Sequence, residues 1–400
     1  MTANKEVAIV GSGVIGLSAG IALLRMIPSL RVNIYEKESG LGYHASGRNS
    51  GVIHAGFYYS PNTLKAKFCR DGNEALIELI TNHSLRLKRT GKVVVTKNVS
   101  ELPYLLELHK RGFDNEVKLE LLESTELKNY EPLARTVDAF LWSPSTSVAS
   151  PQEVIRVLAR EFEDLGGSIL FQQHVEHIDE TYLTVDGIRI PTNVTINCAG
   201  TQAIKFAHEM RVGLDLAQLP FLGLYRFTEH KNLPLQTLVY PLPDKNYPFL
   251  GIHFTISIDG KTKVGPTAIP IIGGEQYKIS QGVTLKDLHQ SARSIKALAT
   301  KNLGQTIRLA RMEFPNVSTK SLLSKANDLV PDATSVVAWE KYKPGIRAQL
   351  VETKTGNFLQ DFRIAKTASV LHVLNSVSPG WTSSIPFGRW LAQESLELLN

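Results

Sequence analysis

The chain has 400 residues, of which 43% are hydrophobic and 20% are charged, a balance typical of a globular protein with more than one domain. Its two cysteines, Cys69 and Cys198, exclude a disulfide framework and indicate a reducing compartment, so we expect a cytoplasmic protein. The net charge of +6 comes from short basic runs without interleaved aromatic residues, and no stretch of about 20 apolar residues occurs, so neither nucleic-acid binding nor a transmembrane helix is expected.

Residues 7–37 predict a nucleotide-binding unit that consists of a strand, a glycine-rich turn, a helix and a second strand. Gly11 lets the chain turn sharply after the first strand, Gly13 lets a pyrophosphate approach the backbone, and Gly16 lets the helix lie close to the sheet. The free N–H groups at the helix N-terminus favour bound phosphates. Glu36, at the end of the second strand, would accept hydrogen bonds from ribose hydroxyls. A glycine turn without a ligand would leave this acid unexplained, so we predict a dinucleotide site.

The chain after this unit alternates between two kinds of segment. The first half of residues 41–68 is rich in Gly, Ser, Asn and His, which is typical of a backbone that follows a ligand. Residues 85–143 change to strand-like runs and short helices. A helix is expected at residues 151–166, with Pro near its start and Gly past its end, and a buried strand then leads into the NCAG motif at residues 197–200.

This alternation predicts two interleaved domains. Residues 1–84, 144–218 and 342–400 are expected to form the dinucleotide-binding domain, and residues 85–143 and 219–341 the second, substrate-binding domain. The predicted fold class is α/β, with a Rossmann-like domain and an inserted α+β domain that is built on a mixed sheet.

Motifs along the whole chain resemble a flavoenzyme family that includes glycine oxidase, D-amino-acid oxidase and glycerol-3-phosphate dehydrogenase, and within it the L-2-hydroxyglutarate dehydrogenases and oxidases. The stretches that carry the resemblance are GSGVIGLSAG at residues 11–20, HASGRNSGVIHAGFYYSPNTLKAKFCRDGN at 44–73, NCAG at 197–200, GIHFT at 251–255, KPGIRAQL at 343–350 and SVSPGWTSS at 376–384. The resemblance implies a Rossmann-like FAD-binding domain of the glutathione-reductase type.

The resemblance also implies that the cofactor is FAD, held without a covalent bond. The residues expected to bind it are those of the glycine turn, the acid after the second strand, a loop along the cofactor, a backbone contact to the adenine and a C-terminal turn over the flavin: Gly11, Gly13, Gly16, Glu36, Lys37, Ser46, Asn49, Ser50, Val52, Val175, Ala199, Gly200, Gly380, Thr382 and Ser383. The N-terminus of the last helix would stabilise the anionic reduced flavin. A purely structural loop is the alternative for residues 46–52.

Oxidation of a 2-hydroxy acid requires a group that holds the carboxylate and a base that takes the hydroxyl proton. The resemblance places Arg347 where amino-acid oxidases have their carboxylate-binding arginine, and its guanidinium fork matches both oxygens; an interdomain salt bridge is the alternative. His253 is favoured as the base and His54 as a contact to substrate or flavin, with a buried structural histidine as the alternative for either. Thr267 and Lys263 are candidates to meet a distal carboxylate. No metal is expected, because the chain lacks Cys/His ligand spacing.

The favoured reaction is therefore the oxidation of L-2-hydroxyglutarate to 2-oxoglutarate, with hydride transfer to flavin N5. Two departures from the family pattern leave another 2-hydroxy acid open: GPTA instead of GPNA at residues 265–268, and Gly380-Trp381 instead of two small residues. A flavin amine oxidase that acts on an amino acid and a flavin-binding subunit without catalysis are also open. The electron acceptor is either oxygen or a membrane quinone, which leaves peripheral association with the inner membrane face open.

Overall fold

The computed structural model describes residues 5–245, 247 and 249–399. Its central feature is a six-stranded sheet in the order β22-β23-β13-β1-β2-β9, in which every neighbouring pair is parallel except β22 and β23. The carboxyl ends of the parallel strands therefore meet at one edge. The strands are β1 (Glu6–Val10), β2 (Arg31–Tyr35), β9 (Ser168–Leu170), β13 (Val194–Asn197), β22 (Arg363–Lys366) and β23 (Val370–Asn375).

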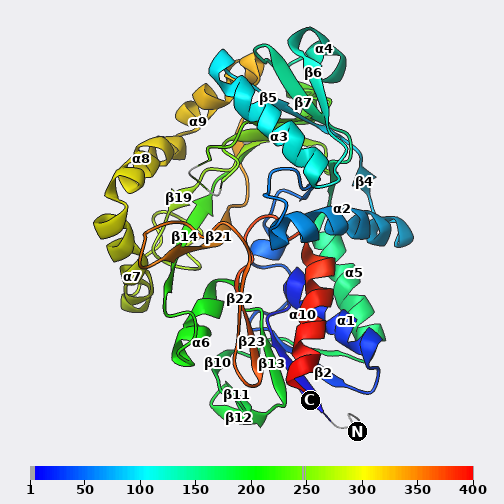
Figure 1. The fold of residues 1–400 in the computed structure, drawn as a ribbon, viewed down its shortest axis with the longest axis vertical. Helices are drawn as coiled ribbons and strands as arrows, with labels where there is room; N and C mark the ends of the chain where they lie inside the picture. The colour runs from blue at the N-terminus through cyan, green and yellow to red at the C-terminus, as the bar shows by residue number, and fades with distance from the viewer. Residues whose placement is uncertain (1–4, 246, 248, 400) are drawn as a thin grey trace.

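Both faces of this sheet are covered, because successive side chains of a strand point to opposite sides. On one face Val7 and Ile9 contact three helices that lie side by side (Figure 1), namely α1 (Val14–Met26), α5 (Pro151–Asp164) and α10 (Ser384–Leu398). On the other face Ala8 and Val10 contact a three-stranded antiparallel sheet of β10 (Val175–Ile178), β11 (Tyr182–Val185) and β12 (Ile188–Pro191). Gly20 lets α1 and α5 approach closely, since a Cβ at this position would lie 2.6 Å from the Phe162 ring.

A second large sheet has eight strands in the order β20-β15-β18-β17-β16-β5-β7-β6, and only β16 and β5 pair in parallel. Leu105 and Leu108 of α3 (Leu102–Asp114) and Leu322 of α9 (Thr319–Ala326) share its hydrophobic core. The strands are β5 (Lys92–Val95), β6 (Glu120–Glu123), β7 (Ala139–Ser143), β15 (Arg226–Glu229), β16 (Leu238–Pro241), β17 (His253–Ile256), β18 (Lys261–Gly265) and β20 (Glu340–Lys341).

Two small antiparallel sheets lie between the large ones (Figure 1). One joins β14 (Leu216–Gly223) to β19 (Ile269–Pro270) and β21 (Gly345–Glu352) and is covered by α7 (Leu285–Lys301) and α8 (Leu303–Glu313). The other joins β8 (Ser147–Ala149) to β3 (Val52–Ile53) and β4 (Leu87–Lys88). The remaining helices are α2 (Leu64–Asn82), which contacts α10, α4 (Leu127–Tyr130), and α6 (Ala203–Glu209), which contacts β23.

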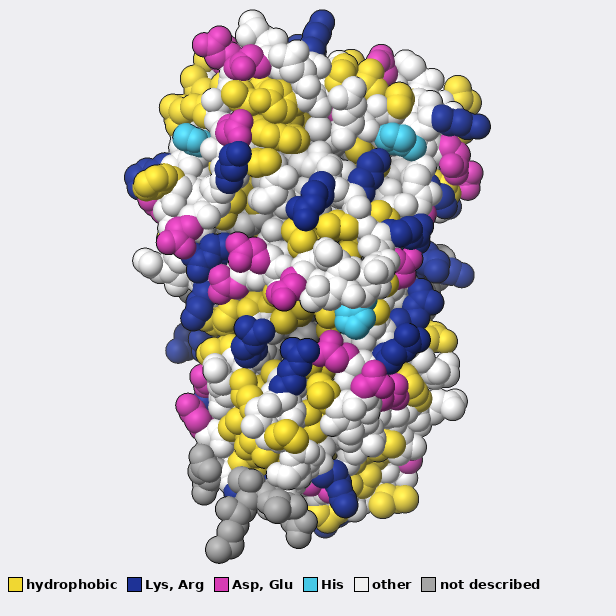
Figure 2. All heavy atoms as spheres, turned by 90° about the vertical axis from the view of Figure 1, so that its right-hand side faces the viewer, with side chains coloured by type: hydrophobic (Ala, Val, Ile, Leu, Met, Phe, Trp, Pro, Cys, Tyr) yellow, Lys and Arg dark blue, Asp and Glu magenta, His cyan; other side chains and the backbone are white. Residues whose placement is uncertain are grey.

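On the face that Figure 2 shows, Lys and Arg side chains are interspersed with acidic, polar and hydrophobic ones. In the part of the chain that the structure describes, no helix is long and apolar enough to cross a bilayer.

The predicted α/β class with a Rossmann-like unit is confirmed. The first predicted unit is present as β1, the glycine turn, α1 and β2, and Glu36 is the first residue beyond β2. The six-stranded sheet takes its strands from residues 6–35, 168–197 and 363–375, and the eight-stranded sheet takes its strands from residues 92–143 and 226–341. The two-domain division at the boundaries given above stays a prediction.

Candidate active site

A cavity of about 460 Å³ opens at the carboxyl edge of the six-stranded sheet. Val10, Tyr35 and Cys198, which end or follow β1, β2 and β13, line its floor together with the start of α1. Ligands of open α/β sheets bind at this edge, where the strands and the first turns of helices converge. We call this space the cofactor cavity.

The glycine turn brings bare backbone to the cofactor cavity. Gly11 has a φ of +103°, and a Cβ there would lie 2.7 Å from the carbonyl oxygen of Cys198. A Cβ at Gly16 would lie 2.2 Å from the carbonyl oxygen of Gly11, so neither position tolerates a side chain without movement. The first turn of α1 contains no acidic residue, and Gly13 offers no side-chain cap. The partial positive charge of this helix end is therefore available to a phosphate.

Glu36 is held in a fixed orientation at the end of β2. Its Oε2 accepts hydrogen bonds from the backbone N–H (3.0 Å) and the hydroxyl (2.7 Å) of Ser12, and its Oε1 accepts one from the backbone N–H of Glu38 (3.0 Å). Ser46 approaches the same turn, because its Oγ accepts a hydrogen bond from the N–H of Val14 (3.1 Å). The acid and the glycine turn thus form one preorganised unit that lines the cofactor cavity.

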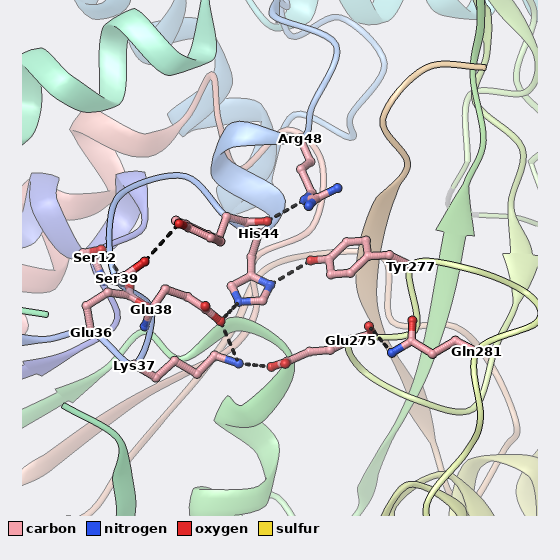
Figure 3. A network of polar contacts seen from close by, with 11 residues as sticks. Ser12, Glu36, Lys37, Glu38, Ser39, His44, Arg48, Glu275, Tyr277 and Gln281 are labelled. Atoms are coloured by element: carbon pink, nitrogen blue, oxygen red, sulfur yellow. Dashed lines mark hydrogen bonds and ion pairs between the residues drawn. The ribbon is translucent and has the colours of Figure 1, made fainter. Parts of the chain in front are cut away.

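A polar network closes the cofactor cavity on a side where two distant segments meet (Figure 3). The Lys37 ammonium pairs with Glu275 and lies 3.6 Å from Glu38. The His44 ring joins Glu38 through Nε2 (2.8 Å) to the Tyr277 hydroxyl through Nδ1 (2.7 Å). We call these five residues the polar latch.

Three residues of the latch carry atoms of the kind that bind metal ions. Ligand atoms of Glu38, His44 and Glu275 lie within 4.8 Å of one another. The Lys37 ammonium, however, already contacts both carboxylates, and the imidazole is engaged by Glu38 and Tyr277. We therefore assign the group to the closure of the cavity. Burial raises the pKa of Tyr277 to about 12, so its hydroxyl stays protonated.

A second cavity of about 330 Å³ adjoins the first. Both cavities are lined by Ser50, His54, Tyr225, Arg347 and Ser378, so they meet at these residues. The remaining wall of the second cavity is rich in aromatic side chains, namely Tyr58, Tyr59, Tyr104, Tyr240, Tyr247 and Phe249. We call it the substrate cavity, because a molecule in it would touch the contents of the cofactor cavity at this junction.

Arg347 stands at the junction of the two cavities. It lies on β21, and its guanidinium carbon is 5.4 Å from the centre of the Phe249 ring. None of the described residues forms an ion pair or a side-chain hydrogen bond with it. A guanidinium keeps its charge at any ordinary pH and matches a carboxylate in a bidentate fork. The junction is thus prepared for an anion.

His253 is a buried, neutral imidazole on β17. Its Nδ1 lies 2.8 Å from the carbonyl oxygen of Gly251, which can only accept, so Nδ1 carries the proton and Nε2 carries the lone pair. The ring stacks on Tyr240 at a centroid distance of 3.8 Å. Burial lowers the pKa of His253 to about 3, and Arg347 and Lys92 act in the same direction. The lone pair on Nε2 is thus the atom through which this ring would accept a proton, although burial and the two cations make it a weak base until a negative charge lies beside it.

His54 lines both cavities and is fixed through its backbone. Its N–H donates to Thr382 Oγ1 (3.1 Å), and its carbonyl oxygen accepts from Asn73 (3.0 Å). The side-chain Nδ1 is buried, and no described residue bonds to it. Burial and the nearby Lys92 hold the pKa of His54 well below its usual range. His54 is consequently a second neutral imidazole at the junction.

Two buried lysines of this region were not predicted from the sequence, Lys92, whose charge acts on both histidines, and Lys65. The Lys92 ammonium has no hydrogen-bond partner among the described residues and lies 4.5 Å from the ring centre of Phe57 and 4.6 Å from that of Tyr58. Burial lowers its pKa to about 7. Lys65, on the first turn of α2, lines the substrate cavity. A lysine that opens the apolar run KVVV is the one signal that could have revealed Lys92.

The structure brings most of the predicted cofactor residues together. All of them except Ser383 line the cofactor cavity; Ser383 is fully buried behind it at the start of α10. Thr382 ties the C-terminal turn to the loop along the cofactor, because its Oγ1 donates to the carbonyl oxygen of Val52 (3.3 Å) and accepts from the N–H of His54.

Two predicted substrate contacts lie elsewhere. Thr267 and Lys263 line neither cavity. The Thr267 hydroxyl donates to the Leu222 carbonyl oxygen (3.1 Å) and accepts from the Leu224 N–H (3.0 Å), whereas the Lys263 ammonium lies 3.9 Å from the centre of the Tyr342 ring. Both side chains are therefore committed to the packing of the sheets, and we do not carry them into the site.

Comparison with known proteins agrees with this geometry. Residues 6–394 match the DAO family model, described as FAD dependent oxidoreductase. The chain is similar to the L-2-hydroxyglutarate dehydrogenase of Indibacter alkaliphilus (33% identity, covering 98% of this chain and 99% of that one) and to that of Salmonella houtenae (33%, 96% and 91%). Among solved structures, it resembles the L-alpha-glycerophosphate oxidase of Mycoplasma pneumoniae with FAD bound, with a TM-score of 0.75, 22% identity and coverage of 99% and 95%.

Proposed function

The chain belongs to the DAO family of FAD-dependent oxidoreductases, and from that premise we propose that it oxidises L-2-hydroxyglutarate to 2-oxoglutarate. The observation that carries this proposal is the junction of the two cavities, where the unpaired guanidinium of Arg347 lies with the neutral imidazole of His54. The similarity to L-2-hydroxyglutarate dehydrogenases over 98% of the chain supports the choice of substrate.

The residues of the cofactor cavity fit FAD. Bare backbone at the glycine turn and the N-terminal end of α1 suit its pyrophosphate, and the fixed carboxylate of Glu36 suits the ribose. The strand start at Val175 would meet the adenine, and the turn that contains Thr382 would lie over the flavin. Bound FAD supplies the acceptor for a hydride.

The chain's own groups would hold the substrate and take its proton. Arg347 binds the C1 carboxylate in a bidentate fork, which orients the C2 hydroxyl. Nε2 of His253 accepts the hydroxyl proton while C2 loses its hydride, so a 2-oxo acid remains. The bound carboxylate brings negative charge beside the imidazole and raises its affinity for the proton. Gly251 fixes the tautomer of His253, and the stack on Tyr240 fixes its plane.

Anaerobic bleaching of the flavin tests the proposal. The purified holoenzyme is mixed without oxygen with L-2-hydroxyglutarate, its D-isomer, L-lactate and a set of amino acids, and the loss of flavin absorbance is followed. We expect bleaching by L-2-hydroxyglutarate alone. Bleaching only by an amino acid would establish the amine oxidase instead, and a yellow protein that none of these compounds bleaches would overturn the proposed substrate and favour a flavin-binding subunit without catalysis.

Readmission of air to the bleached enzyme separates the two electron acceptors. Rapid recolouring identifies oxygen as the acceptor and the protein as an oxidase. Slow recolouring that a soluble quinone accelerates identifies a quinone-linked dehydrogenase, and sedimentation with membrane vesicles then tests peripheral association.

A further inference from the structure

The substrate cavity contains more positive charge than the fixing of one carboxylate requires. Its wall includes four basic side chains, those of Lys65, Arg111, Lys245 and Arg347. Arg111 pairs with Glu107 (2.6 Å) and donates to the carbonyl oxygen of Tyr58 (2.7 Å), and Lys245 also pairs with Glu107. Lys65 and Arg347 pair with no acid among the residues that the structure describes. The cavity thus offers two uncommitted cations.

Lys65 is buried, and its ammonium forms no ion pair with any carboxylate of the described residues. The residue is 3% exposed, and its Nζ lies 5.9 Å from the ring centre of Tyr59 and 5.8 Å from that of Phe362. The nearby carboxylate of Asp361 attracts this ammonium through space but forms no ion pair with it, because its oxygens accept the backbone N–H groups of Leu64 (2.9 Å) and Lys65 (3.0 Å) at the start of α2. An unpaired buried ammonium is unfavourable, and an anion beside it would relieve that cost.

The two cations occupy different parts of the cavity. Arg347 lines both cavities and therefore stands at the junction with the cofactor, whereas Lys65 lines the substrate cavity alone. Aromatic side chains such as Tyr58, Tyr240 and Phe249 form much of the remaining wall and suit the methylene groups of a short chain. A molecule with a carboxylate at each end would satisfy both cations at once.

We propose that Lys65 binds the second anionic group of the substrate and makes the enzyme selective for 2-hydroxy acids that carry a distal carboxylate. This inference rests on the proposed function, since it assigns the distal end of the same substrate. Lys65 takes the role that the sequence had suggested for Thr267 and Lys263, which the structure places outside the cavity.

The test compares two ligands that cannot react and differ by one carboxylate. Glutarate and pentanoate have the same number of carbons, and their affinity for the holoenzyme is measured by calorimetry and by the change of the flavin spectrum. The wild type is expected to bind glutarate about 10- to 100-fold more tightly, as one charge-assisted pair allows. Lys65→Met is expected to abolish this preference and to leave pentanoate binding unchanged. Lys67→Met, at an exposed position of the same helix, serves as the matched control.

Two further variants separate charge from folding. Lys65→Arg keeps the charge and is expected to retain a preference for glutarate, while Lys65→Gln removes the charge with little loss of volume and is expected to lose it. Flavin content and thermal midpoint are measured for each variant. An undiminished preference for glutarate in Lys65→Met and Lys65→Gln would overturn the inference, as would a wild type that binds both ligands equally or binds neither.

The outcomes for the two proposals are distinguishable. The wild type could fail to oxidise L-2-hydroxyglutarate and still prefer glutarate, with Lys65→Met lacking that preference. In that case the proposed substrate is wrong and the anion subsite stands. If L-2-hydroxyglutarate is oxidised and the ratio of glutarate to pentanoate affinity does not depend on Lys65, the proposed function stands and the subsite is rejected.

Discussion

The two adjoining cavities are built by opposite means. The cofactor cavity is shaped largely by backbone and by polar side chains that already have partners, as Glu36 has in Ser12 and Ser46 has in Val14. The substrate cavity contains buried hydroxyls without partners among the described residues, those of Tyr58 and Tyr240, and at its junction with the cofactor cavity His54 Nδ1 also lacks one. The fold itself therefore prepares the cofactor site, while individual side chains prepare the substrate site for a ligand that supplies what they lack.

The largest effect should come from a change in the cofactor cavity. In Gly16→Ala the new methyl group would collide with the carbonyl oxygen of Gly11, so the turn must open and the protein should purify without flavin. The ratio of absorbance at the flavin band to that of the protein measures this loss. Gly304→Ala is the control, because a Cβ at that position meets open space. A yellow Gly16→Ala protein with full flavin content would contradict the account of the turn.

A change in the substrate cavity should leave the flavin in place and remove activity. His253→Asn is expected to lower kcat/KM about 10²- to 10⁴-fold, the usual contribution of a general base. Flavin content should match that of the wild type, because His253 lines only the substrate cavity. His289→Asn, at an exposed position, is the control. Unimpaired turnover in His253→Asn would shift the role of the base to His54.

The polar latch closes the cofactor cavity on one side, so a change in it should weaken the retention of FAD and leave turnover by the bound flavin unchanged. Tyr277→Phe removes the hydroxyl that contacts His44, and the loss of one hydrogen bond corresponds to roughly a 5-fold weaker affinity for FAD. Flavin release during dialysis against a chaotrope measures the change, with Tyr182→Phe in the small sheet as the control. A variant that retains flavin as the wild type does would assign the latch no part in cofactor binding.

The smallest expected effect is on stability and arises from one histidine of the substrate cavity and one of the six-stranded sheet. Burial lowers the pKa of His253 to about 3 and that of His372, in the six-stranded sheet, to about 4. The folded state then binds fewer protons than the unfolded state between these values and about 6.5, so stability falls as the pH drops through that window. Each group contributes about 1 kcal/mol per pH unit below 6.5. Urea midpoints at pH 7.5 and 5.5 should show a smaller difference in His372→Gln.

The sequence predicts the cofactor side well because its determinants are local. Gly11, Gly16 and Glu36 lie within one strand-turn-helix-strand unit whose geometry follows from short-range sterics. Lys65 and Lys92 escape such reasoning, since only packing between distant segments brings Lys92 near the histidines and Lys65 to the wall of the substrate cavity. The latch residue Tyr277 belongs to a loop that carries no motif.

Lys263 and Thr267, which line neither cavity, show why the sequence alone could not place them. Lys263 lies on β18, where a shift of one residue exchanges the two faces of the strand, and nothing in the sequence alone fixes that register. Thr267 follows the same strand and depends on the same register. The charge of Lys263 and the nearness of both residues to a family motif in the sequence therefore do not show whether their side chains reach the substrate cavity.

The position of α10 has a consequence for how the protein folds. This helix is far from α1 in the sequence, yet it lies against it, where a Cβ at Gly388 would be 2.5 Å from that of Ser18. The contact is therefore long-range, and α1 keeps this apolar side uncovered until α10 docks. The helix that begins at the glycine turn thus depends for its packing on a segment from the other end of the described residues.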